Sequence, residues 1–223
     1  MNLSKAFSVL LEGDMKHLIK SVKRPKMSLL GRFRRNRQGV AMAEFALFLP
    51  VLVLLAAGSF EVARYALMTQ KLDRIAATLS DLIARSGTEN ISETEISNII
   101  DSAIFMAQPF DIAGENMIIL TSVQGRAGEA PEILSQRVAG SVDGASSRIG
   151  DTVGGDATLP SVFPDAGSGE TLSDGETLIV AEVYYNFRPY LLGDIGFFGD
   201  MMISSRAFFR PRFTDMITFP SGS

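Results

Sequence analysis

One carboxylate in this sequence lies where a carboxylate is costly. Residues 40–60 form an apolar run whose only formal charge is Glu44. An acid at the centre of a bilayer costs on the order of 3 kcal/mol, and less near the interface. Glu44 is therefore the side chain whose type and position could do chemistry, either by pairing with a positive charge or, more simply, as a tolerated residue at the edge of a membrane span.

Gly39 stands between this run and the basic residues that precede it. Counted from Gly39, Glu44 is the fifth residue and Phe45 the sixth. The arrangement resembles the prepilin cleavage motif, in which a membrane peptidase cuts after the glycine. The resemblance implies cleavage between Gly39 and Val40 by a prepilin peptidase, with Glu44 and Phe45 as assembly and docking residues.

The similarity extends over residues 34–68. The string "RRNRQGVAMAEFALFLPVLVLLAAGSFEVARYAL" resembles the TadE/TadG-like minor pseudopilins of the tight-adherence (Tad) pilus system. Those proteins combine the glycine, an acid followed by an aromatic residue, a Leu-Pro-rich span and a Glu-x-x-Arg beyond it. Here the span contains Leu49-Pro50, and the last pair is Glu61 and Arg64. The resemblance implies a pilin-like subunit whose partners are other pilins and pseudopilins and an inner-membrane assembly platform.

The resemblance also implies a role for the charge of Glu44. After a cut at Gly39, Val40 would carry a free ammonium one helical turn away, and Glu44 would face the amino terminus of a neighbouring subunit. Because either charge alone is costly in a poorly solvated environment, the pair rewards the correct register more than it adds net stability. Pro50 removes one helical hydrogen bond and usually bends the helix, which serves either extraction from the bilayer or packing alone.

The charges around the apolar run are one-sided. Residues 1–39 contain ten Lys and Arg and two acids, whereas residues 40–223 contain eleven Lys and Arg and twenty-three acids. A helix needs about 20 apolar residues to cross a bilayer, and basic flanks stay in the cytoplasm. We therefore expect a basic cytoplasmic leader at 1–39, a transmembrane segment surrounded by lipid at 40–60, and an exported periplasmic domain at 61–223. The expected location is the bacterial inner membrane, with entry into a pilus left open.

Two other interpretations of the apolar run remain open. A signal-anchored periplasmic binding or adhesin domain would use residues 40–60 only as a tether, with no prepilin processing. A secreted protein would be released after about Ala57 or Gly58, where "LLAAGS" offers small residues. An internal start at Met15 or Met27 would shorten the long leader in any of these cases.

Residues suited to catalysis are scarce. The chain has no cysteine, and its single histidine, His17, lies in the basic leader. It contains no P-loop, no dinucleotide-binding glycine fingerprint, no H-E-x-x-H and no G-x-S-x-G. No nucleic-acid recognition module follows the basic leader. We expect no enzymatic activity, no cofactor and no nucleic-acid partner.

The elements that position Glu44 and the Glu61/Arg64 pair begin with one long helix at 40–86. Its second half shows apolar residues at intervals of three and four, and Gly87 supplies a stop. The stripe consists of Tyr65, Met68, Leu72, Ile75, Leu79 and Leu82. The first half of this helix would lie in lipid and the second half against a soluble domain.

A second helix is predicted from Ser92 to about Ala107, because Ser92-x-x-Glu95 is typical of a capping box and Pro109 ends the pattern. Three strands follow, which are rich in branched and aromatic residues, at 116–123, 176–187 and 201–209. One face of the middle strand carries Ile179, Ala181, Val183, Tyr185 and Phe187. This face should pack on the helices.

Residues 124–175 are dominated by Gly, Ser, Asp, Ala and Pro, which predicts long loops. A loop of this length is uncommon, so the range is either an exposed interaction region or contains short strands that the pattern hides. It contains five aspartates, Asp143, Asp151, Asp156, Asp165 and Asp174. Their spacing does not follow a calcium-binding EF-hand loop, so we assign them to turns and expect no metal site.

Together these elements predict an α+β, pilin-like fold. A long N-terminal transmembrane and amphipathic helix packs on a small antiparallel sheet with long Gly/Ser/Asp-rich loops.

Overall fold

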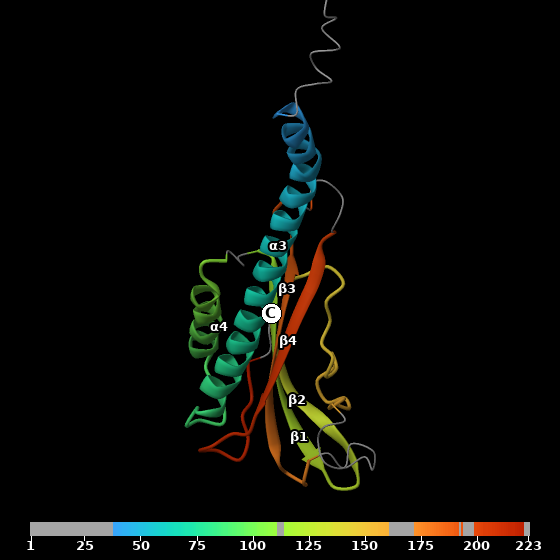
Figure 1. Ribbon diagram of the computed structural model, residues 1–223. Helices are drawn as coiled ribbons and strands as arrows, with labels where there is room; N and C mark the ends of the chain where they lie inside the picture. Colours follow the sequence, from blue (N-terminus) through green and yellow to red (C-terminus); the bar gives the residue numbers. More distant parts are fainter. Residues whose placement is uncertain (1–37, 111–113, 161–171, 192, 194–198, 221–223) are drawn as a thin grey trace, which may run out of the picture. The chain divides into compact units, whose positions relative to one another are not determined.

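A computed structural model of the chain describes residues 38–110, 114–160, 172–191, 193 and 199–220 (Figure 1). Most of the basic leader, including His17, and Asp165 in the loop region lie outside these ranges. The chain divides into two compact units, Met1–Leu54 and Leu55–Ser223. Helix α3, Gln38–Ala84, begins in the first unit and continues in the second.

The first unit contributes residues 38–54 of α3, and its large apolar side chains are exposed. Val40 is 55% exposed and Phe45 is 58% exposed. Leu55, the first residue of the second unit, is 65% exposed. Within the described residues, α3 is the one helix long and apolar enough to cross a membrane, and its most apolar window is entirely unburied. Such a helix indicates membrane anchoring, as the sequence predicted.

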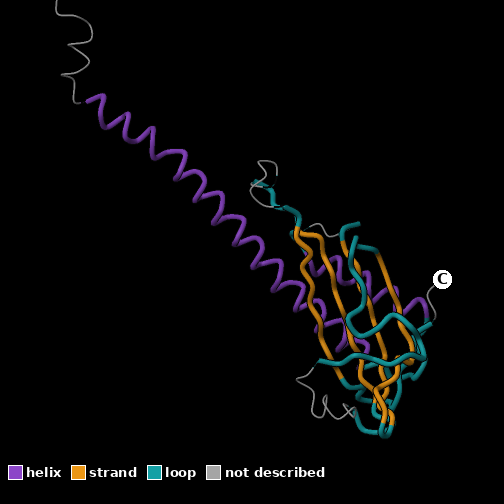
Figure 2. The backbone as a smooth tube through the Cα atoms, turned by 90° about the vertical axis from the view of Figure 1, so that its right-hand side faces the viewer, coloured by secondary structure: helices purple, strands orange, loops and turns teal. Residues whose placement is uncertain are grey.

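The second unit has the expected α+β architecture. Four strands, β1 (Asn116–Arg126), β2 (Glu129–Gly140), β3 (Thr177–Phe187) and β4 (Met201–Phe209), form one antiparallel sheet in the order β2-β1-β3-β4. The second half of α3 and helix α4 (Glu93–Ala107) lie on one face of this sheet (Figure 1). Loops cross the opposite face (Figure 2).

The core between α3 and the sheet follows the predicted stripe in its middle and departs from it at both ends. Met68, Leu72, Ile75 and Leu79 are fully buried, but Tyr65 and Leu82 are each 40% exposed. In place of Leu82, Ile83 is fully buried. An α-helix turns once every 3.6 residues, so a stripe with a mean spacing near 3.5 drifts around it, and by the last turn another side chain faces the core.

Helix α4 begins and ends where the sequence predicted. The Ser92 hydroxyl caps it by accepting the N–H of Glu95 at 3.2 Å, and the helix stops at Ala107, before Pro109. The ammonium of Lys71 on α3 donates to the carbonyls of Met106, at 3.4 Å, and Gln108. A cation at the carboxyl end of a helix is favourable, so Lys71 fastens α4 to α3.

The three predicted strands correspond to β1, β3 and β4. The predicted inner face of β3 is confirmed, because Ile179, Ala181, Val183 and Phe187 belong to the core cluster shared with α3, and Tyr185 packs against it. The other face of β3 is buried as well, beneath the loops.

The loop prediction for 124–175 is wrong for part of that range, where the hidden-strand alternative holds. Strand β2 lies entirely within it, and only its alternate residues Pro131, Ile133 and Ser135 are buried. Few residues of β2 are both apolar and buried, so its sequence gives little sign of a strand. The strand exists because it pairs with β1 on one side, while the Ile133 N–H donates to Gly155 O at 2.9 Å on the other.

The phase of α3 is testable with neighbouring substitutions. We expect Ile83→Ala to lower the free energy of unfolding by about 2 to 5 kcal/mol, because it leaves a cavity in the core. Leu82→Ala, at a half-exposed position, should cost under about 1 kcal/mol. Urea unfolding of the full chain in detergent measures both values. Equal losses would place the core face of α3 between the two residues and contradict this packing.

Candidate functional site

The predicted cleavage and docking residues lie together at the start of α3. The helix begins at Gln38, so the Gly39–Val40 peptide bond falls in its first turn. Val40, Glu44 and Phe45 are exposed, and a Cβ placed on Gly39 would meet no atom within 4 Å. Val40 and Glu44 are four residues apart and therefore share one face of the helix.

Glu44 has no basic residue near it along this segment. Residues 38–54 contain no lysine or arginine, so Glu44 is the only charged side chain described in the first unit. Pro50 lies inside α3, with helix on both sides of it. A bend at Pro50, like cleavage after Gly39 and docking through Glu44, stays a prediction.

The second predicted pair, Glu61 and Arg64, forms an ion pair in the second unit. Arg64 Nη1 lies 2.9 Å from Glu61 Oε2. The other oxygen of this carboxylate accepts the backbone N–H of Leu191, in the connection between β3 and β4. Glu61 is only 5% exposed, and each of its two carboxylate oxygens has a partner within the fold. The carboxylate thereby fastens α3 to a segment 130 residues further along the chain.

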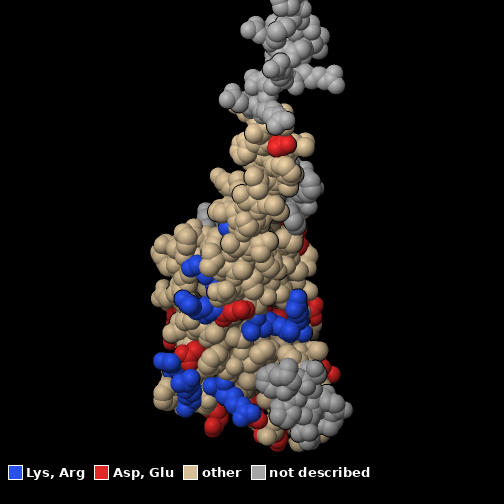
Figure 3. All heavy atoms as spheres, in the orientation of Figure 1, with Lys and Arg blue, Asp and Glu red and all other residues tan. Residues whose placement is uncertain are grey.

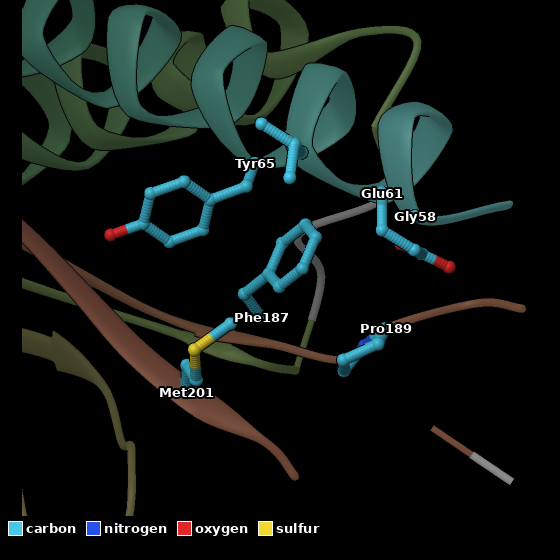
Figure 4. Close-up of a pocket in the computed structure, with 7 residues that line it drawn as sticks. Gly58, Glu61, Tyr65, Phe187, Pro189 and Met201 are labelled. Atoms are coloured by element: carbon cyan, nitrogen blue, oxygen red, sulfur yellow. The ribbon is translucent and has the colours of Figure 1, made fainter. Parts of the chain in front are cut away.

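Aromatic rings complete this contact. The guanidinium carbon of Arg64 lies 5.2 Å from the ring centroid of Phe187 and 5.6 Å from that of Tyr190. Phe187 also meets Tyr65 edge to face, with ring centroids 5.7 Å apart. Figure 4 shows the Phe187 side chain pointing from β3 toward α3. Cation–π and edge-to-face contacts of this kind add to the burial that holds the strand end against the helix.

A small pocket of about 190 Å³ lies beside the ion pair (Figure 4). Its lining comes from one face of α3 and from the facing ends of β3 and β4. The lining residues are Gly58, Glu61, Val62, Tyr65, Phe187, Pro189 and Met201. The Glu61 carboxylate is already held by Arg64 and Leu191, so the pocket suits an apolar group and has no oriented set of groups for acid–base chemistry.

A buried acid on the other face of the sheet was not anticipated from the sequence. Glu182 is fully buried and accepts the Arg148 N–H at 3.0 Å and the Tyr184 hydroxyl at 3.1 Å. The Ser147 hydroxyl also donates to it, and the Tyr184 hydroxyl lies 2.7 Å from the carbonyl of Ser146. This cluster fixes the loop that follows β2 onto the sheet. The available signal was a lone acid within the apolar run 177–187.

The cluster changes the acidity of Tyr184. Burial, with the nearby charge of Glu182 as the next cause, raises the pKa of the Tyr184 hydroxyl to about 12. Both causes disfavour the phenolate. The hydroxyl therefore remains a hydrogen-bond donor at any physiological pH.

The described aspartates of the loop region make one local contact and two long-range contacts. Asp174 accepts the Ala127 N–H at 3.3 Å, and Asp151 accepts the Thr152 hydroxyl at 3.1 Å. Asp156 pairs with Arg126. Within the described ranges, no group of three or more histidine, cysteine or acidic side chains is arranged to hold a metal ion.

Comparison with known families bears on the same segment. Residues 39–79 match the family model described as TadE-like protein, which confirms the resemblance seen in the sequence. The matched range begins at Gly39 and includes Glu44, Pro50 and the Glu61/Arg64 pair. No curated protein and no solved structure matches the chain. The match supports a Tad pilus-related component. The TadE-like family that the segment resembles is itself structural.

The Glu61–Arg64 contact should contribute more than an ordinary surface pair. Arg64→Met leaves a carboxylate in a site where the Glu61 side chain is 6% exposed, so we expect a loss of about 1 to 3 kcal/mol and faster hydrogen exchange at the Leu191 amide. The matched control is Arg85→Met, which breaks an i,i+4 pair between Asp81 of the same helix and Arg85, the residue just after it, which is 56% exposed. Asp81 keeps its second partner, Arg212. The control should change little. Equal effects in unfolding and amide exchange would contradict the proposed fastening.

Tyr184 should make stability depend on alkaline pH. The folded chain keeps the phenolic proton up to about pH 12, whereas the unfolded chain loses it near pH 10, so the contribution of Tyr184 is complete below pH 10 and falls toward pH 12. Tyr184→Phe removes this dependence together with the hydrogen bond to Ser146, at a cost of about 1 kcal/mol near neutral pH. The difference in unfolding free energy between the two proteins should therefore narrow as the pH rises. A constant difference would refute the assignment.

Proposed function

We propose that this chain is a minor pseudopilin of a Tad-type pilus, matured by a prepilin peptidase after Gly39 and assembled through Glu44. One observation carries the proposal. Gly39, Glu44 and the Glu61/Arg64 pair all fall within the segment that matches the TadE-like model, on the helix that can span a membrane. The proposed location is the inner membrane, single-pass, with the amino terminus cytoplasmic and the second unit periplasmic.

The local geometry suits this processing. The bond to be cut is exposed, and a cut there gives Val40 a new ammonium group one turn before Glu44 on the same helix face. The amino end of a helix also carries a partial positive charge, which favours a carboxylate nearby. Because residues 38–54 contain no lysine or arginine, the ammonium of a neighbouring subunit is the counter-charge that assembly would supply to Glu44.

A tethered binding domain is the second candidate, and one observation favours it. The buried hydrophobic core of the described residues begins at Met68 and includes none of residues 38–54. The second unit therefore has a core of its own, as a domain that uses its anchor only as a tether would have. The two candidates differ in whether Gly39 and Glu44 matter.

Replacing Gly39 tests the processing step. The wild-type protein should be recovered with Val40 at its amino terminus, and Gly39→Leu should accumulate as the uncut precursor in the membrane. Because the site has room for a side chain, the loss would reflect peptidase recognition and not misfolding. Amino-terminal sequencing and intact mass give the answer. A wild-type chain that is uncut favours the tether, and one that begins after Ala57 or Gly58 favours secretion.

Replacing Glu44 tests the docking step separately. Glu44→Gln keeps the size of the side chain but removes its charge, so we expect normal export and cleavage with loss of surface pili. Glu44→Asp keeps the charge and should retain more assembly than Glu44→Gln. Pilus counts by electron microscopy, together with the amount of mature protein, measure both. Normal piliation in the Glu44→Gln strain would exclude docking through this carboxylate.

A further inference from the structure

The second unit exposes a group of apolar side chains around the turns of α3 where the apolar run ends. They come from α3, from the connection between β3 and β4, and from the start of β4. The group, here termed the apolar collar, consists of Phe60, Val62, Tyr190, Leu191 and Met201, which are 39% to 74% exposed. Exposed apolar patches on folded domains generally mark a surface that something else covers.

The described charges beside the apolar collar each have a partner in the chain, although Arg188 and Asp200 are 63% and 56% exposed. Glu61 is held by Arg64 and by the Leu191 N–H, and Arg64 lies over the rings of Phe187 and Tyr190. Arg188 pairs with Glu115 at 2.9 Å and with Asp200 at 3.4 Å. On the face shown in Figure 3, charged atoms gather over the lower half of the second unit, and the region around its first helical turns is largely uncharged.

The apolar collar is continuous with the membrane-spanning run. Phe60 is the last residue of the run 40–60 and belongs to the second unit, as do the other collar residues. A bilayer that surrounds this run would therefore contact Phe60 and the collar residues beside it. Tyrosine and other amphipathic aromatic side chains favour the boundary between acyl chains and headgroups, and Tyr190, the most exposed member, fits that preference.

We propose that the apolar collar is a lipid-contacting surface, which seats the second unit in the membrane interface with acyl chains covering the pocket beside Glu61. The ion pair has a definite part in this arrangement. By satisfying the first acid after the span inside the fold, it lets the following turn of α3 remain in the interface without an unpaired charge. The proposal needs membrane anchoring, but it does not depend on cleavage after Gly39.

The chain contains no tryptophan, so one introduced indole reports its own environment without background. The test uses full-length Tyr190→Trp in vesicles of phosphatidylethanolamine and phosphatidylglycerol, with and without lipids brominated along their acyl chains. The matched control is Phe213→Trp, since Tyr190 and Phe213 are 74% and 72% exposed. The neighbour of Phe213, Arg212, bonds to Ala84 at the end of α3, about 30 Å along that helix from Arg64.

Tyr190→Trp should emit at shorter wavelength than Phe213→Trp and should lose intensity to the brominated lipids, whereas the control should lose none. Met201→Trp should behave like Tyr190→Trp, and it decides the question if Tyr190→Trp fails to fold. Equal response of Tyr190→Trp and Phe213→Trp would overturn the proposal. So would a blue shift that grows with protein concentration but is insensitive to bromine, because it would show a second copy of the chain on the collar. Repeating the test with Gly39→Leu separates this result from the fate of the processing proposal.

Discussion

The packing of α3 against the inner face of β3 is the interaction on which the rest of the second unit depends. Six side chains of α3, Met68, Leu72, Ile75, Ala76, Leu79 and Ile83, share one core with that face. Two other segments also bond to α3. Lys71 donates to the carboxyl end of α4, and Ala84 O accepts the N–H of Arg212 near the carboxyl terminus. The helix whose length and apolar composition indicate membrane anchoring is therefore also the central support of the second unit.

Two acids on α3 have different surroundings within the described residues. Glu61 is satisfied entirely by its own chain, through Arg64 one turn away and Leu191 far along the sequence. Glu44 lies in a segment that offers it no basic residue. The same chemical group thus stabilises a folded domain in one place and, in the proposed function, requires a second molecule in the other. Position relative to a counter-charge, and not residue type, separates the two roles.

Local patterns predicted the elements that have strong periodicity, and failed where long-range contacts decide. The apolar run, the stripe on α3, the Ser92 cap and the alternation along β3 are visible over a few residues each. Strand β2 is not, because its partners are β1 and a loop that bonds to part of its outer edge, and neither leaves a periodic pattern in the β2 sequence. The Glu61/Arg64 pair was found from its spacing, but its third partner, the N–H of Leu191, is a backbone group that no side-chain pattern marks. Glu182 was overlooked because its partners, Ser147 and Arg148, lie in a loop without periodicity.

The loop that lies along β2 has a consequence for how copies of this chain could pair through their sheets. Gly154 N–H donates to Ile133 O at 2.8 Å, and Ala157 N–H donates to Pro131 O at 2.6 Å, so the chain occupies the outer hydrogen-bonding edge of its own sheet there. An open edge is a template for strand pairing between molecules, and covering it prevents runaway aggregation. Along residues 131–133, a neighbouring copy could add a strand only by first displacing the loop. Growth into a polymer through strand exchange is thereby disfavoured on the β2 side, which leaves ordered assembly to contacts that can be made and broken without unfolding the domain.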